Sequence, residues 1–323
     1  MKAGKALALA ALLALAVVIG AGLIADVDRL QKAAVAYPWW RVAAACALVL
    51  GNYALRTVRF RYYLNALNLR VSLSEAALVF VAGFLFTVTP GKMGEVVKGW
   101  LLKQRRGASV TDVATSVIAE RFTDVVGLLA IAALGVAQHG AHSGLFVAVL
   151  ALCGAFLFAV LHPTAVPSGL RWGKAALAER LPAKASAAFD AVTRIHAVLR
   201  DLCRPRRLLF GVTLAAAAWL LEAIAFRVLL DGLNAGGGLG SAVVIYAMAT
   251  LFGAASMLPG GVGSTEAVMV ALCLSPGLGL GLDLPQATFA TLLIRFATLW
   301  FGVILGAICF LPAQRPAAGH ASA

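Results

Sequence analysis

The stretches TPGKMGE at Thr89–Glu95 and LPGGVGSTE at Leu258–Glu266 decide the fold. Each interrupts an apolar run with Pro-Gly, and each places a glutamate shortly after its last glycine. Within a membrane, the backbone leaves the helix only where it lines a cavity or is buried in protein. Matching broken segments in two halves of a chain are typical of a transporter's substrate site. The two stretches therefore predict translocation of a lipid or solute.

The composition places the whole chain in a membrane. Of its 323 residues, 62% are hydrophobic and 13% are charged, and the mean hydropathy is +0.92. These values predict a polytopic membrane protein with a single integral domain over residues 1–323. The net charge of +13 comes from basic segments between apolar spans, which is typical of cytoplasmic loops and excludes nucleic acid as the expected partner.

Neither a metal nor another cofactor is expected. The five cysteines form no CxxC motif and lie mostly in apolar spans, so a disulfide framework or a zinc site is not indicated. Only His139 and His142 are close enough in sequence to share a metal, and two loop histidines without a third ligand are ordinary loop residues.

Apolar windows of about 20 residues predict six full spans. They are Ala6–Ile24, Arg41–Val58, Thr111–Ala137, Ser143–His162, Leu208–Leu230 and Thr288–Leu311. The first follows Lys2 and Lys5, the charge order of a signal peptide, but it is nearly long enough to span and leads into further spans. We therefore expect it to be a retained first helix.

Two further apolar regions fit re-entrant hairpins better than full spans. Their arms are Leu73–Thr89 with Gly94–Leu102, and Ser241–Leu258 with Ser264–Leu274. Two hairpins bring the basic residues to one side, which the positive-inside rule makes cytoplasmic. These residues are Arg56, Arg59, Arg61, Arg70, Lys98, Lys103, Arg105, Arg106 and the stretch Arg171–Arg207. The loops around His139, Asp231 and Asp283 are then outside, and both termini are cytoplasmic.

This assignment contains an internal repeat. The order span, hairpin, span occurs at residues 41–137 and again, inverted, at 208–311, which is the architecture expected of alternating access. Between the repeats, residues 163–207 are too polar to span. Their apolar residues at helical spacing are Phe189, Val192, Ile195 and Leu199. The linker is therefore either an amphipathic helix on anionic headgroups or a helix packed on its own bundle.

Three charges lie near the middle of the span Thr111–Ala137, namely Glu120, Arg121 and Asp124. The residues spaced to share one helix face are Ser116, Glu120, Asp124 and Gly127, with Thr123 beside them. A charge at this depth costs about 2.5–3.5 kcal/mol on insertion scales, so we expect a wet cavity or tight pairing. The alternative is an Arg121–Asp124 pair that only holds helices together.

Arg295 has the equivalent depth in the last span and follows the second hairpin as Arg121 follows the first. If the two halves face each other, both guanidiniums meet in one cavity, where a planar cation that keeps its charge suits a phosphate. Neutralisation of Arg295 by Glu120 or Asp124 is the alternative.

The hairpin tips are further candidates, because a half-helix that begins at a glycine-rich break presents its positive end to a ligand. Lys92 lies beside the first tip, whereas Lys98 could be only a snorkelling interface residue. Glu95 and Glu266 are either proton or cation carriers or charges that stabilise the half-helices. The predicted substrate-binding residues are Pro90, Gly91, Lys92, Gly94, Glu95, Glu120, Arg121, Asp124, Pro259, Gly260, Gly261, Gly263, Glu266 and Arg295.

An enzyme is not expected. His196 and Asp201 match the HxxxxD spacing of glycerolipid acyltransferases, but an offset of five separates them on a helix and no glycerophosphate-binding motif accompanies them. A Walker A lysine, a GxSxG elbow and a DxD pair suited to nucleotide sugars are also missing. Transport work would therefore come from an ion gradient, a lipid gradient or a partner.

Three motifs in this order resemble the flippase-like transmembrane domain of the lysylphosphatidylglycerol synthase family. They are Pro90–Glu95, Glu120–Asp124 and Pro259–Glu266, within a resemblance that runs from about Trp40 to Leu311. The resemblance implies movement of a lipid, such as an aminoacylated phospholipid, between leaflets. Bifunctional members add a soluble aminoacyl-transferase domain, and because the sequence stops at Ala323 without one, lysyl transfer is not expected.

The sequence therefore predicts a flippase-like transporter for an amphipathic lipid with an anionic or zwitterionic headgroup. Its expected location is a bacterial inner membrane, with membrane lipids as partners. One alternative is a non-transporting protein that holds or delivers lipid to a separate synthase. Another is a membrane-embedded lipid transferase.

Overall fold

The computed structural model describes residues 27–89, 93–139 and 183–315, with isolated residues outside these ranges. Within them every regular element is a helix, as the composition predicts. The elements are α2 (Val27–Ala36), α3 (Trp40–Ala66), α4 (Leu73–Ala82), η1 (Gly83–Phe86), α5 (Met93–Arg106), α6 (Val110–His139), α9 (Ala183–Leu202), α10 (Pro205–Asp231), α11 (Leu239–Ala255), η3 (Pro259–Gly261), α12 (Ser264–Cys273), η4 (Pro276–Leu278), α13 (Leu284–Arg295), η5 (Phe296–Trp300) and α14 (Phe301–Ala313).

The chain is a polytopic helical membrane protein. Among the described residues, α10 and the continuous helix Leu284–Ala313 are long and apolar enough to cross a membrane. Helices α2 and α3, which meet at an 80° bend, meet the same criterion only when the pair is counted as one span. The last span contains a π-helical turn, η5, directly after Arg295. The predicted spans Ala6–Ile24 and Ser143–His162 lie largely outside the described residues.

Helix α3 is longer than the sequence predicts, because it continues past Val58 to Ala66. Arg56, inside the predicted span, and Arg59, just past its end, both lie inside the bundle, with exposed fractions of 7% and 0%. The predicted span ended at Val58 because charged residues interrupt the apolar window there, although the helix continues. The cytoplasmic side expected for both arginines stays a prediction.

The first hairpin has α4 and η1 as one arm and α5 as the other. The arms are in close contact at Gly83 and Gly94, where a Cβ added to Gly94 would lie 2.5 Å from the Gly83 carbonyl oxygen. A glycine is required there because backbone atoms leave no room for a side chain. The predicted tip residues Pro90, Gly91 and Lys92 lie outside the described residues.

Gly94→Ala should therefore destabilise the protein by about 1–3 kcal/mol, the usual cost of overpacking. The matched control is Gly277→Ala, because a Cβ added to Gly277 has its nearest neighbour at 3.9 Å. Thermal unfolding of both variants in detergent measures the difference. Equal stability of the two would contradict the close contact between the arms.

The second hairpin joins α11 to α12 through η3. Its tip glycines have left-handed backbone, with φ of 61° at Gly260, 64° at Gly261 and 88° at Gly263, a conformation that glycine adopts at little cost. The arms again meet at a glycine, since a Cβ added to Gly253 would lie 1.9 Å from Thr265 Oγ1.

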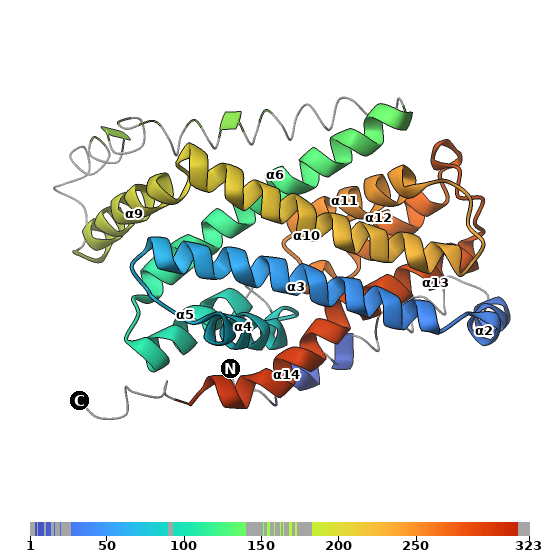
Figure 1. The fold of residues 1–323 in the computed structure, drawn as a ribbon, viewed down its shortest axis with the longest axis horizontal. Helices are drawn as coiled ribbons and strands as arrows, with labels where there is room; N and C mark the ends of the chain where they lie inside the picture. Colours follow the sequence, from blue (N-terminus) through green and yellow to red (C-terminus); the bar gives the residue numbers. More distant parts are fainter. Residues whose placement is uncertain are drawn as a thin grey trace.

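The first helices of the two predicted repeats, α3 and α10, lie side by side and antiparallel (Figure 1). Near the start of α3, Tyr37 Oη donates to the Leu229 carbonyl at 2.8 Å. Further along, Asn52 Nδ2 donates to the Ala218 carbonyl at 2.8 Å. As residue numbers rise along α3, those of the contacting residues on α10 fall, so the two helices run antiparallel. An inverted repeat requires this relation between its corresponding helices.

The two halves also exchange contacts through their last helices. At Gly135 in α6 an added Cβ would lie 2.6 Å from Val244 of α11, and at Gly306 in α14 it would lie 2.4 Å from the Leu85 amide nitrogen in η1. Each half therefore packs its last helix on the first arm of the other half's hairpin (Figure 1). This places the two hairpin breaks next to the boundary between the halves.

The membrane orientation stays a prediction that cysteine labelling tests. A cysteine replacing Asp283, exposed at the start of α13, should react with an impermeant thiol reagent added outside whole cells. A cysteine replacing Arg70, exposed between α3 and α4, should react only after permeabilisation. Labelling of Arg70→Cys in intact cells would contradict the inverted assignment.

The linker helix α9 packs on α6. Leu199 and Leu202 of α9 are buried in a cluster with Tyr63 and Phe122, so the end of α9 follows the bundle-packing alternative. Val192 is exposed, and the side chain of Phe189 lies outside the described residues.

Candidate functional site

A cavity of about 230 Å³ lies where the two hairpins meet. Its wall takes residues from α3, both hairpins, α6, α10 and the last span. The charged residues that line it are Arg56, Glu95, Lys98, Arg121, Glu222 and Arg295. Both halves of the chain thus supply charges to one cavity.

In the first half, Arg121 extends from the middle of α6 to the second arm of the hairpin. Its Nε lies 2.8 Å from Oε1 of Glu95, which is in the first turn of α5. Its Nη1 lies 3.4 Å from Asp124 Oδ2. The side chain remains 40% exposed, so acids hold part of the guanidinium and the rest is free to bind another anion.

The second half repeats this arrangement. Arg295 Nε donates to Glu266 Oε1 at 2.7 Å, and Arg295 Nη2 donates to the Gly260 carbonyl at 2.7 Å. Glu266 lies in the first turn of α12, as Glu95 lies in the first turn of α5. Each hairpin therefore presents a glutamate just after its break to the arginine of the following helix.

These contacts correct the expected partners of Arg295. Neither Glu120 nor Asp124 pairs with Arg295, because Glu266 does. Glu266 also caps its half-helix, since its Oε2 accepts from the Gly263 amide at 2.8 Å. The Glu266 carboxylate therefore has two structural roles: it stabilises the start of α12 and it positions the Arg295 guanidinium.

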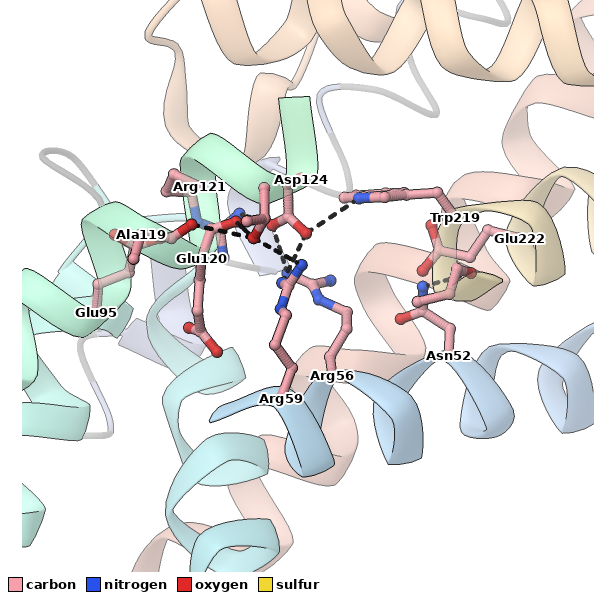
Figure 2. A network of polar contacts seen from close by, with 12 residues as sticks. Asn52, Arg56, Arg59, Glu95, Ala119, Glu120, Arg121, Asp124, Trp219 and Glu222 are labelled. Carbon is pink, nitrogen blue, oxygen red and sulfur yellow. Dashed lines mark hydrogen bonds and ion pairs between the residues drawn. The ribbon is translucent and has the colours of Figure 1, made fainter. Parts of the chain in front are cut away.

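Asp124 is the centre of a buried network behind the cavity (Figure 2). Its Oδ1 accepts from Arg59 Nη2 at 2.7 Å and from Trp219 Nε1 at 3.1 Å. Its Oδ2 lies 3.6 Å from Arg56 Nη2. Asp124 thus binds α3, α6 and α10 together, far more extensively than the expected Arg121–Asp124 pair alone.

The expected polar face of α6 is a packing face rather than a wet one. An added Cβ on Gly127 would lie 2.8 Å from the Ala216 amide nitrogen of α10, and Ser116 is fully buried. The sequence predicted either a wet cavity or tight pairing for the charges of α6, and Asp124 is tightly paired. Arg121 is the charge of α6 that lines the cavity.

Lys98 is not a snorkelling residue. Its side chain is 4% exposed, and its Nζ lies 3.7 Å from Glu120 Oε2. The ammonium also lies 4.1 Å from the centre of the Phe80 ring and 5.2 Å from that of Phe60. Aromatic faces and one carboxylate stabilise this buried cation.

A second carboxyl, Glu222 of α10, lines the cavity, and sequence analysis missed it. It is 3% exposed and accepts a hydrogen bond from Tyr246 Oη of α11. Glu222 is the single acid within the predicted span Leu208–Leu230, and an isolated intramembrane carboxyl is a signal that could have found it. The other polar wall residues that were missed are Tyr53, Arg56, Thr87, Trp219, Tyr246, Thr250, Thr265 and Thr298.

The predicted site residues fall into three groups. Those that line the cavity are Gly94, Glu95, Arg121, Gly260, Gly261 and Arg295. Those outside its wall are Glu120, Asp124, Pro259, Gly263 and Glu266. Pro90, Gly91 and Lys92 are outside the described residues. Binding of a substrate by any of them stays a prediction.

Comparison with known proteins identifies one family. Residues 11–306 match the family described as the lysylphosphatidylglycerol synthase TM region. A UPF0104 membrane protein of Methanothermobacter thermautotrophicus is 26% identical over 314 residues, 93% of this chain and 90% of the relative. A UPF0104 membrane protein of Pyrococcus horikoshii is 25% identical over 315 residues, which are 90% of this chain and 91% of the relative. Both relatives are archaeal, and their names state a membrane location and no activity.

Proposed function

The chain belongs to the family of lysylphosphatidylglycerol synthase transmembrane regions, and we propose that it moves an amphipathic phospholipid between membrane leaflets by alternating access. The observation that carries this proposal is the cavity shared by Arg121 and Arg295, one guanidinium from each half. The resemblance of the sequence motifs to a flippase-like domain agrees with the proposal.

The chemistry of the cavity suits a phosphate headgroup. An arginine presents up to five donors in a fixed fork that matches phosphate oxygens. Glu95 and Glu266 each bind the Nε of their arginine, which leaves other N–H groups of Arg121 available for a ligand. The volume is below the roughly 300–1,000 Å³ of pockets for drug-sized ligands, so the cavity admits a headgroup while the acyl chains stay in the bilayer.

The arrangement of the halves supports alternating access. The cavity lies at the junction of two broken segments, and each arginine is held by its own hairpin. A relative movement of the halves would carry one arginine away from the other and would open the cavity to one leaflet at a time. The phosphate binds while both arginines face it and is released when they separate.

A protein that holds lipid for a separate synthase is the second candidate. Its support is that an arginine-lined cavity binds a headgroup equally well without releasing it to the other leaflet. Binding alone therefore does not separate the two functions.

Reconstitution into vesicles separates them. The vesicles contain phosphatidylcholine, phosphatidylglycerol and a trace of phosphatidylethanolamine with a fluorescent headgroup in both leaflets, and dithionite added outside quenches exposed label. Transport predicts that nearly all label becomes quenchable, whereas protein-free vesicles keep the inner half protected. A protected inner half, with lipid bound to the protein, would favour the holding role.

The proposal extends to location. The loop charges support termini in the cytoplasm, and the family resemblance supports a bacterial inner membrane, although the named relatives are archaeal. The labelling of Asp283→Cys and Arg70→Cys tests the orientation in the host that makes the protein.

A further inference from the structure

Glu222 differs from the other carboxylates around the cavity. Four of these carboxylates have a cation within 4.0 Å, namely Glu95, Glu120, Asp124 and Glu266. Among the described residues, Glu222 has no cation at ion-pair distance, and its partner is the Tyr246 hydroxyl. An ionised carboxylate without a cation is costly at membrane depth, so Glu222 is the acid best placed to hold a proton.

The charges of the cluster give that proton a role. The cations in and behind the wall are Arg56, Arg59, Lys98, Arg121 and Arg295. Five cations face the four paired carboxylates, so the described cluster has one excess positive charge when Glu222 is protonated. It is neutral when Glu222 is ionised. A phosphodiester headgroup has a single negative charge, so its binding is favoured when Glu222 holds a proton.

Charged or titratable groups face Glu222 from each of the helices α3, α6, α11 and α13 that pack on α10. Arg56 and Tyr53 face it from α3, Asp124 from α6, Tyr246 from α11 and Arg295 from α13. Arg56 lies over the rings of Phe80 and Trp219, at 5.6 Å and 5.1 Å from their centres, and its Nη2 is directed to Asp124.

We propose that Glu222 is a proton-binding site coupled to the headgroup, so that one proton accompanies each singly anionic lipid. This inference rests on the function proposed above and names the ion that drives it. On the loading side hydronium gives its proton to the Glu222 carboxylate, so one of its O–H bonds breaks as the carboxyl O–H bond forms. On the release side the carboxyl O–H bond breaks and water takes the proton. Tyr246 is a positioning residue that holds the carboxyl toward the cavity.

The test compares rates of label movement in the vesicles described above at mildly acidic and mildly alkaline pH, equal on both sides. Raising the pH ionises Glu222 and removes the excess positive charge, so the wild-type rate should fall about tenfold, the effect of a unit charge roughly 10 Å away at the dielectric of protein sites. Glu222→Gln should keep the acidic rate at both pH values. Asp283→Asn, an exposed acid changed in the same way, should follow the wild type.

Tyr246→Phe gives a readout that a purely structural residue would not move. It keeps the ring and removes the hydroxyl that donates to the carboxylate, so the fall in rate should shift to higher pH. A wild-type rate independent of pH, or a Glu222→Gln rate that falls as the wild type does, would overturn proton coupling and leave lipid movement standing. Absence of label movement at every pH would overturn the proposed function as well.

A measurement on the wild type alone covers the case in which Glu222→Gln does not fold. Purified protein in weakly buffered detergent, at a pH where the vesicle rate is falling, should take up about half a proton per molecule when phosphatidylglycerol is added, the most that a tenfold difference in affinity between the two protonation states allows. A pH indicator reports the uptake, and phosphatidylcholine is the neutral control. Equal signals with the two lipids would overturn the proposal.

Discussion

Lipid movement should fall at least about tenfold when Arg295→Gln is combined with Glu266→Gln, even though the protein still folds. The guanidinium loses its charge-assisted contacts to the headgroup, while no carboxylate is left unpaired. Glutamine keeps an acceptor at position 266 for the Gly263 amide, so the half-helix cap is retained. The matching pair in the first half, Arg121→Gln with Glu95→Gln, should have the same effect. Dithionite accessibility of the label measures both.

The single changes serve as controls for folding. Arg295→Gln alone leaves Glu266 near the membrane centre without its cation, which costs about 3–5 kcal/mol for a buried pair. Low expression of the single variant with recovery in the double variant would identify this pair as structural support. Recovery of lipid movement as well would show that the guanidiniums are counter-ions only, and the substrate would then bind elsewhere.

The second large effect is on stability. Asp124→Asn should destabilise the protein by about 3–5 kcal/mol, because it leaves Arg59 and Arg56 buried without their carboxylate. The amide keeps the volume and an acceptor for Trp219 Nε1, so the loss is one of charge. Thermal unfolding in detergent measures it.

Asp112→Asn is the matched control for Asp124→Asn. Asp112 lies in the first turn of the same helix and is half-buried rather than buried, so its amide should unfold within a few degrees of the wild type. If Asp124→Asn were as stable as Asp112→Asn, the network in Figure 2 would not hold the helices together.

Much of the fold could be predicted because breaks are local signals. A Pro-Gly pair inside an apolar run can be recognised as a hairpin break from a single sequence. Two such breaks predicted the helix pairs α4–α5 and α11–α12. Depth along a helix is also local, at 1.5 Å per residue. Equal depth, together with the assumption that the two halves face each other, predicted that Arg121 and Arg295 line one cavity.

Partners across helices could not be predicted in the same way. Sequence gives the depth of Arg295 but not which helix packs beside it, so Glu266 was missed as its partner. Arg59 was left outside the predicted span because charges ended the apolar window, although its contact with Asp124 holds it inside the helix bundle. The closeness of Gly83 to Gly94 depends on the packing of two arms, which spacing does not encode.

The central claim is that the cavity between the hairpins holds a phospholipid headgroup, and native mass spectrometry tests it most directly. The wild-type protein and Asp283→Asn, released gently from membranes, should each retain a phosphate-bearing lipid. The variant with Arg121, Glu95, Arg295 and Glu266 all changed to glutamine should retain at least about tenfold less, because both guanidiniums are gone. Equal retention of the same lipid by all three proteins would contradict the account.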